Sequence, residues 1–276
     1  MDHSRSHRCV IPLVVIEDAA KSTRGDFRTM VDHNVERLVG AIERSKYGSH
    51  VRLLTVHYHD EIAVKRQFAP LRDIRPGALE LADCRGTAAT GKAILFALDE
   101  VKRQYKQWEG EKTLHTRPIF LLLTDDRPVD CPAEQVQEME ADYQKAVRRV
   151  RSWEQEGELT MAGCALSQLR LIRCNKGKLQ ELCGKTFEVR QMPDGVEHME
   201  EGFASVISWV EMAITDAWND RPRPEERRPP RNDEGSDKRP EWAKEDSRMH
   251  DPAPGPAPDD PIRRFMGILN EREDAS

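Results

Sequence analysis

The segment CVIPLVVI, from Cys9 to Ile16, decides the fold. It is an unbroken run of aliphatic and β-branched residues, which is typical of a strand that is buried on both faces of a parallel sheet. Two acids, Glu17 and Asp18, follow it directly. The segment PIFLLLT, at residues 118–124, has the same character and runs into Asp125. Two buried strands that end in carboxylates are therefore expected at the centre of the protein.

Further strands and helices alternate around these two segments. Amphipathic helices show apolar residues at helical spacing, and strands show short apolar runs bounded by turn residues. Helices are expected at residues 26–45, from 86–91 to 112, and at 133–155, 176–183 and 196–214; strands are expected at 51–57, 62–68, 158–165 and 186–189. This alternation predicts an α/β fold over residues 1–218: a doubly wound, mostly parallel sheet with helices on both faces.

The carboxyl-terminal part has a different composition. Residues 219–259 are rich in proline and in both signs of charge, so we expect a disordered linker. Residues 260–276 then begin with Asp260, a good helix cap, and Pro261, which suits the first helical position. A short amphipathic helix is predicted there, with one apolar stripe that is a candidate docking surface for a partner: Ile262, Phe265, Met266 and Leu269.

Composition excludes several classes of protein. The net charge of −6 and the pI near 5.9 lack the basic excess that nucleic-acid backbones select, so no nucleic-acid partner is expected. The longest apolar run is far shorter than the ~20 residues that span a membrane, and no signal peptide is recognisable, so we expect a cytoplasmic protein without a membrane partner. The six cysteines form no C-x-x-C pair and are expected to be buried free thiols.

The acids after the two buried strands suggest a metal site. Carboxyl ends of parallel strands meet at one rim of a doubly wound sheet, where ligands bind. The loop from Thr87 to Gly91 opens a helix at the same rim. Oxygen ligands from several loops are what Mg²⁺ requires. The alternative interpretation is that Asp18 and Asp125 only accept hydrogen bonds from a helix start and a loop.

The same segments resemble a known family. A von Willebrand factor A (vWA) domain carries a metal-ion-dependent adhesion site (MIDAS) that reads D-x-S-x-S, then a G-T loop, then T-D-G. This chain shows VVIEDAAKST, RGTAATGKAI and FLLLTDDRPVD in that order. The late segment FASVISWV is similar to the closing helix of tellurium-resistance TerY-type members. The resemblance covers about residues 8–215 and implies a vWA, Rossmann-like fold.

The first motif of the resemblance is incomplete. Asp18 and Ser22 match its aspartate and second serine, whereas Ala20 stands where the first serine belongs. The family's metal ligands therefore carry over only in part, and one hydroxyl ligand is missing.

The other two motifs also depart from the family. Ala88 occupies the threonine position of the loop, and Thr87 lies one residue early. Asp125 matches the T-D-G aspartate, while Asp126 replaces the glycine and is a candidate partner contact. The predicted Mg²⁺ ligands are thus Asp18, Ser22, Thr87 and Asp125.

Two other groups invite functional interpretations. His57 and His59 can project from one face of a strand and hold zinc, but no third ligand stands at a diagnostic spacing, so rim histidines are the favoured interpretation. Cys131 lacks a supporting histidine and is interpreted as structural rather than as a nucleophile.

The resemblance implies a protein-binding adaptor rather than an enzyme. Relatives of the TerY type belong to bacterial stress-response or phage-conflict systems, which makes a Ser/Thr kinase and a PP2C-type phosphatase the expected partners. Two alternatives remain: a vWA partner of an AAA+ ATPase, and a phosphoacceptor or phosphatase-like enzyme that uses Asp18. Against the latter, a D-x-D motif is lacking, because Ala20 follows Asp18 by two residues.

Overall fold

A central sheet organises the computed structural model, which describes residues 9–74, 77, 79, 84–125, 133–167, 176–190 and 197–221. Seven strands form the sheet in the order β3-β2-β1-β5-β6-β7, with β4 paired to β1. All neighbouring strands are parallel except β2 and β3, which form an antiparallel pair at one edge. The strands are β1 (Cys9–Asp18), β2 (Val51–Tyr58), β3 (Ile62–Pro70), β4 (Leu114–His115), β5 (Ile119–Thr124), β6 (Thr160–Ser167) and β7 (Lys185–Arg190).

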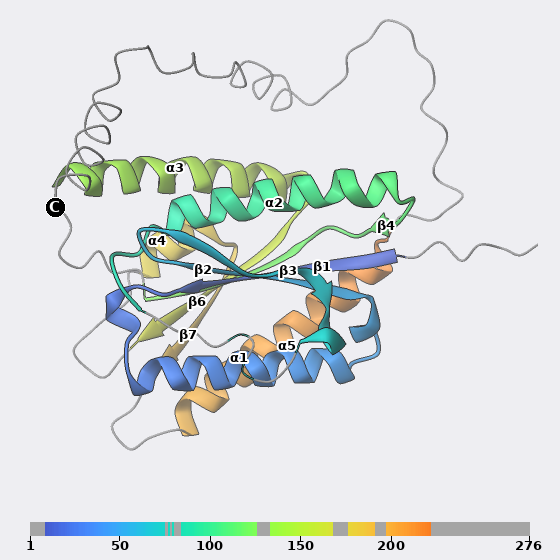
Figure 1. The fold of residues 1–276 in the computed structure, drawn as a ribbon, viewed down its shortest axis with the longest axis horizontal. Coiled ribbons are helices and arrows are strands. Elements are labelled where there is room, and N and C mark those ends of the chain that lie inside the picture. Colours follow the sequence, from blue (N-terminus) through green and yellow to red (C-terminus); the bar gives the residue numbers. More distant parts are fainter. Residues whose placement is uncertain are drawn as a thin grey trace, which may run out of the picture. The chain divides into compact units, whose positions relative to one another are not determined.

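Helices cover both faces of this sheet (Figure 1). One face carries α1 and α5, and the other carries α2, α3 and α4. Their bounds are α1 (Asp26–Arg44), α2 (Thr90–Gly110), α3 (Ala133–Gln155), α4 (Lys176–Leu182) and α5 (Glu197–Asn219), with short 3₁₀ turns η1 (Lys21–Thr23), η2 (Gly48–His50) and η3 (Leu71–Asp73). The predicted doubly wound α/β fold is confirmed.

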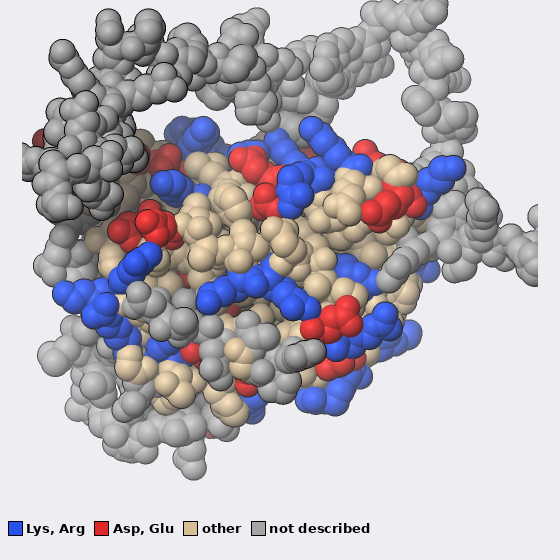
Figure 2. Space-filling model, viewed as in Figure 1, with Lys and Arg blue, Asp and Glu red and all other residues tan. Residues whose placement is uncertain are grey.

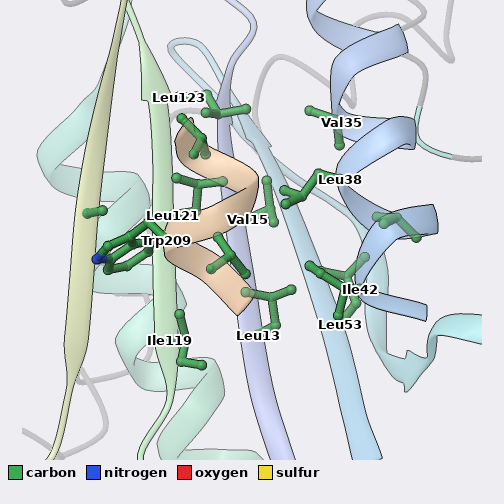
Figure 3. Packing of buried hydrophobic residues seen from close by; sticks show 14 of the residues in the cluster. Leu13, Val15, Val35, Leu38, Ile42, Leu53, Ile119, Leu121, Leu123 and Trp209 are labelled. Atoms are coloured by element: carbon green, nitrogen blue, oxygen red, sulfur yellow. The ribbon is translucent and has the colours of Figure 1, made fainter. Parts of the chain in front are cut away.

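Alternation along β1 divides the core into two layers. Leu13 and Val15 pack toward α1 and α5, together with Leu38 of α1 and Trp209 of α5 (Figure 3). Val14, Ile16 and their neighbours pack toward α2 and α3. Because successive side chains of a strand point to opposite faces, a run that is apolar throughout must be covered on both sides. The alternation continues to the end of the strand, so the side chains of Glu17 and Asp18 point to different layers.

Gly91, in the first turn of α2, explains how that helix reaches its place. A Cβ atom built on Gly91 would lie 2.3 Å from the backbone nitrogen of Tyr143 in α3. Real carbon atoms do not approach a backbone so closely, so only glycine permits this contact between the two helices. The start of α2, which carries the rim loop, is thereby fixed against α3.

Most predicted elements are present, with differences at their ends. The helix predicted to close the domain ends at Asn219 rather than at Ile214, and the helix predicted from residues 86–91 begins at Thr90. The two-residue strand β4 was not expected. None of the helices that the structure describes is long and apolar enough to cross a membrane. The linker from residue 222 onward, the predicted helix at 260–276, Asp126 and Cys131 all lie outside the described residues.

Candidate interaction rim at the carboxyl ends of the strands

Four segments meet at the carboxyl ends of β1, β2 and β5. We define the rim as residues 18–24, 59–61, 84–89 and 124–125. Backbone hydrogen bonds connect the loops to one another and to the end of β2: the amide of Ala19 donates to the Tyr58 carbonyl (2.7 Å), Arg85 to Ala19 (3.0 Å), Ala89 to His59 (3.1 Å) and Lys21 to Gly86 (3.3 Å). Because these bonds run between loops rather than within them, the rim is one preorganised surface.

Asp18 lies at the bottom of the rim and is fully buried. Its Oδ1 accepts a hydrogen bond from the Ala20 amide, and its Oδ2 accepts one from the Thr124 hydroxyl, both at 2.9 Å. Burial raises the pKa of Asp18 to about 8, and the nearby charge of Asp125 adds to the rise, although the hydrogen bonds oppose it. Asp18 therefore holds a proton over most of the neutral range, and it acts as an acceptor for its own loop.

The structure brings Asp125, one of the predicted metal ligands, close to Asp18. Asp125 follows β5 and is buried. Ser22 lies on the turn η1. The Thr87 hydroxyl contacts the Met139 sulfur of α3 at 3.9 Å. The loop position expected to supply a metal-binding hydroxyl thus faces a neighbouring helix.

The two alanines of the degenerate motifs have a defined structural role. Ala20 and Ala88 are buried in the apolar layer beneath α2 and α3. Within the described part of the chain, no group of three or more His, Cys, Asp or Glu side chains is placed to hold a metal ion. Asp18 and Asp125 are the two carboxylates that the described residues bring together here, and Mg²⁺ would need further oxygen ligands around them.

Glu17 forms a buried ion network that the sequence did not reveal. Its Oε2 accepts a hydrogen bond from Nη2 of Arg28 at 2.5 Å, and its Oε1 lies 3.3 Å from Nε2 of His57. Arg28 also donates from Nε to Asp32 at 2.8 Å, and from Nη1 to the backbone carbonyl of Asp18 at 3.1 Å. The network joins α1 to the ends of β1 and β2, directly beside the rim.

Opposite charges set the pKa of Glu17. Burial alone raises that pKa, but the interactions with His57 and Arg28 outweigh the burial and bring it below 4.5. Two signals in the sequence pointed to this arrangement: Arg28 and Asp32 stand at i and i+4 on a helix, and an acid interrupts an apolar strand. The missing information was the register, which pairs Glu17 with His57 across β1 and β2.

The interpretation of the two histidines as rim residues holds for only one of them. His57 is buried in the network just described, whereas His59 lies in the turn after β2 and pairs with Asp60. Among the described residues, no group of three or more His, Cys, Asp or Glu side chains that could hold a metal ion includes either of them. The four described cysteines are buried free thiols, as expected: Cys9, Cys84, Cys164 and Cys183.

Charged side chains of both signs surround the buried acids. Lys21 and Arg24 are exposed on the loop after β1. Arg85 pairs with Glu61 at 2.8 Å across two rim loops. Intermixed signs are also visible over the face of the molecule in Figure 2. The rim thus offers fixed charges above a dry floor, an arrangement that suits contact with another protein.

Comparisons with known proteins identify the fold. No family model matches the chain, and no curated protein matches it. Solved structures do: proximal thread matrix protein 1 from the mussel byssus has 14% identity and a TM-score of 0.51, over 74% of this chain and 46% of that protein. Another structure of that protein, with a zinc-occupied MIDAS motif, has 13% identity and a TM-score of 0.50 over the same shares.

A bacterial structure gives the same result. The PilB minor pilin from Streptococcus sanguinis has 8% identity and a TM-score of 0.51, over 76% of this chain and 63% of the pilin. The chain thus spans less than two thirds of each of these proteins. At such identities the likeness concerns the fold alone, and that fold is vWA-like.

Proposed function

We propose that this vWA-like domain is a non-catalytic adaptor that binds a partner protein at the rim. The observation that carries the proposal is the set of backbone hydrogen bonds that joins the rim loops. A surface that is already ordered loses little conformational entropy on binding, which favours recognition of a protein. A protein-interaction role is also what the vWA-like fold suggests, as an analogy between folds.

The environment of Asp18 supports a non-catalytic role over the phosphoacceptor alternative. A carboxylate that accepts a phosphoryl group has to be ionised and within reach of its substrate. Asp18 is 0% exposed, is protonated over most of the neutral range, and has hydrogen bonds to its own loop and to Thr124. The same geometry favours partner binding that does not depend on Mg²⁺.

The finer assignment rests on the resemblance described above. It places the protein in the cytoplasm of a bacterium, in a stress-response or phage-conflict system, with a Ser/Thr kinase and a PP2C-type phosphatase as partners. A second contact would come from the apolar stripe at Ile262, Phe265, Met266 and Leu269, outside the described residues. Tethering two partners raises their effective concentration for each other. An AAA+ ATPase as the rim partner is the alternative.

Charge reversal at the rim tests the proposal directly. Purified full-length protein is mixed in turn with a Ser/Thr kinase, a PP2C-type phosphatase and an AAA+ ATPase from the same organism, and binding is measured by calorimetry with Mg²⁺ and with chelator. The double variant Lys21→Glu/Arg24→Glu is expected to lose at least about tenfold in affinity for the rim partner. The control Arg148→Glu changes an exposed charge on α3 and should bind normally. Equal binding by the wild type, the double variant and the control would exclude the rim as the partner-binding surface.

Truncation separates the second contact from the first. Removing residues 260–276 is expected to leave the melting temperature and rim binding unchanged while one partner is lost. A substantially lower melting temperature would mean that the segment packs on its own domain. Acetyl-phosphate labelling that disappears in Asp18→Asn would overturn the non-catalytic role.

A further inference from the structure

A second site lies at the opposite end of the sheet from the rim. A cavity of about 530 Å³ opens beside Val10 and Arg52, at the amino ends of β1 and β2, and is closed on its other sides by β3 and the second half of α2. Cavities of ~300–1,000 Å³ are typical of small-molecule sites. We propose that this cavity binds a small organic anion with a flat apolar body, such as an aromatic carboxylate or phosphate ester.

The helix α2 supplies one wall of the cavity, because the residues that line it recur at helical spacing. Four of its residues line the cavity at positions i, i+1, i+4 and i+5, and the residue that caps the helix follows at i+8, so together they form a single stripe: Arg103, Gln104, Gln107, Trp108 and Glu111. Residues at such spacings lie next to one another on a helix surface. The stripe faces the sheet instead of solvent at Gln104 and Trp108, both of which are buried.

An aromatic pair forms the apolar part of the site. Phe68 of β3 and Trp108 of α2 pack edge to face, with ring centroids 5.4 Å apart. Val10 and Pro70 extend this apolar surface. These side chains give the otherwise polar cavity an apolar patch on which one face of a flat ring can pack.

Gln104 provides the polar group that a ligand would satisfy. Its side chain is only 8% exposed and lines the cavity, yet it makes no hydrogen bond within the described part of the chain. Gln104 is not among the residues with fully buried, unpartnered side-chain atoms, so its amide is open to the cavity. An oxygen of a bound ligand could accept a hydrogen bond from this amide.

Two guanidinium groups determine the sign of the ligand's charge. Arg52 is 8% exposed, and its Nη1 donates to the carbonyls of Ser49 (3.0 Å) and Val51 (2.8 Å), which fix it at the cavity wall. Arg103 is held from outside by Glu100, at 2.6 Å. The one acid among the lining residues is Glu111.

The position of Arg52 in the sheet strengthens this inference. Arg52 continues the row of Leu54 and Val56, which is apolar and packs under α2, so packing alone does not call for a charge there. A guanidinium held rigidly beside an aromatic pair is suited to a planar carboxylate or to a phosphate group. The charges and the apolar wall together select an anion with a ring, not a cation or a sugar.

The test is calorimetry and ligand-detected NMR on the full chain with three probes of one shape: benzoate, phenyl phosphate and the neutral benzamide. Benzoate or phenyl phosphate is expected to bind with a Kd below about 10 mM, and benzamide at least about tenfold more weakly. The indole N–H signal of Trp108, assigned with Trp108→Phe, should shift on addition of the anion. No binding by either anion, or equal binding of benzamide, overturns the proposal.

Variants identify the residues that carry the binding. Arg103→Ala is expected to weaken anion binding about fivefold or more, and Gln104→Glu to abolish it, because the new acid repels the ligand. The matched control is Arg149→Ala, which also breaks one ion pair, with Asp99, but does not line the cavity. Binding that survives both Arg103→Ala and Gln104→Glu in folded protein would place the ligand elsewhere. Loss of binding in Arg149→Ala would have the same meaning.

Discussion

Glu17 and Asp18 are neighbours at the end of one strand, yet they lie in different electrostatic environments. Glu17 points to the layer of α1, where Arg28 and His57 lower its pKa. Asp18 points to the layer of α2 and α3, where burial and Asp125 raise its pKa to about 8. One side of the sheet therefore holds an ionised acid in a salt bridge, and the other holds an acid that is mostly protonated at neutral pH.

The motifs that resemble a metal site lie on the Asp18 side of this difference. On the α2 side, alanines replace two hydroxyl positions, and no basic side chain compensates the acids among the contacts of Asp18 that the structure gives. On the α1 side, Arg28 and His57 offset the cost of burying Glu17, so its pKa stays low. The Glu17 network and the hydrogen bonds between the loops thus both stabilise the rim.

Removing the cation of the network should have the largest effect. Arg28→Met leaves Glu17 and Asp32 buried without their common partner, so the free energy of unfolding is expected to fall by about 3–5 kcal/mol. Chemical denaturation followed by circular dichroism measures it. The control Arg149→Met breaks the more exposed pair with Asp99 and should cost less than about 1 kcal/mol. Equal losses in both variants would contradict the distinction between the layers.

Neutralising Asp18 should have a smaller effect, of the opposite sign. Because the folded-state pKa of Asp18 is raised, the stability that its proton provides is complete below pH 3.8 and is lost as the pH rises toward about 8. Asp18→Asn removes this loss. The free energy of unfolding of the variant is therefore expected to exceed that of the wild type by about 1–3 kcal/mol at pH 8 and by little at pH 4. A pH-independent difference would argue against a protonated Asp18.

The matching change at Glu17 sharpens the comparison. The pKa of Glu17 is lowered, so its contribution is present above pH 4.5 and is lost as the pH falls through the folded-state value. Glu17→Gln is expected to be less stable than the wild type at pH 7, with a deficit that shrinks in acid. The two variants should therefore show opposite pH trends in the same denaturation experiment.

Restoring the missing hydroxyls should give the smallest effect. In Ala20→Ser/Ala88→Thr, Mg²⁺ is expected to raise the free energy of unfolding by about 1 kcal/mol when it exceeds its Kd about fivefold. The wild type should gain much less, because Ala20 and Ala88 stand where the motif has hydroxyl ligands. Thermal melts with Mg²⁺ and with chelator measure both. If Mg²⁺ stabilises the wild type as strongly as the variant, the wild-type site binds the metal without the two hydroxyls.

Sequence reasoning predicted the rim more fully than it predicted its surroundings. Apolar strands that end in acids were enough to bring Asp18 and Asp125 together. Thr87 could not be placed, because one residue of shift in a loop decides whether a hydroxyl faces the rim or Met139. The role of Glu17 depended on a partner on the next strand, which no local pattern identifies.

By itself, the sequence determined the layers: apolar runs must be covered on both faces, and helical spacing shows which helices can cover them. Only the tertiary structure decided how the charges are compensated. Electrostatic energies depend on distance and burial, and Arg28, His57 and Asp125 reach the end of β1 from three different elements. Two adjacent acids in the sequence therefore acquired opposite pKa shifts in the fold.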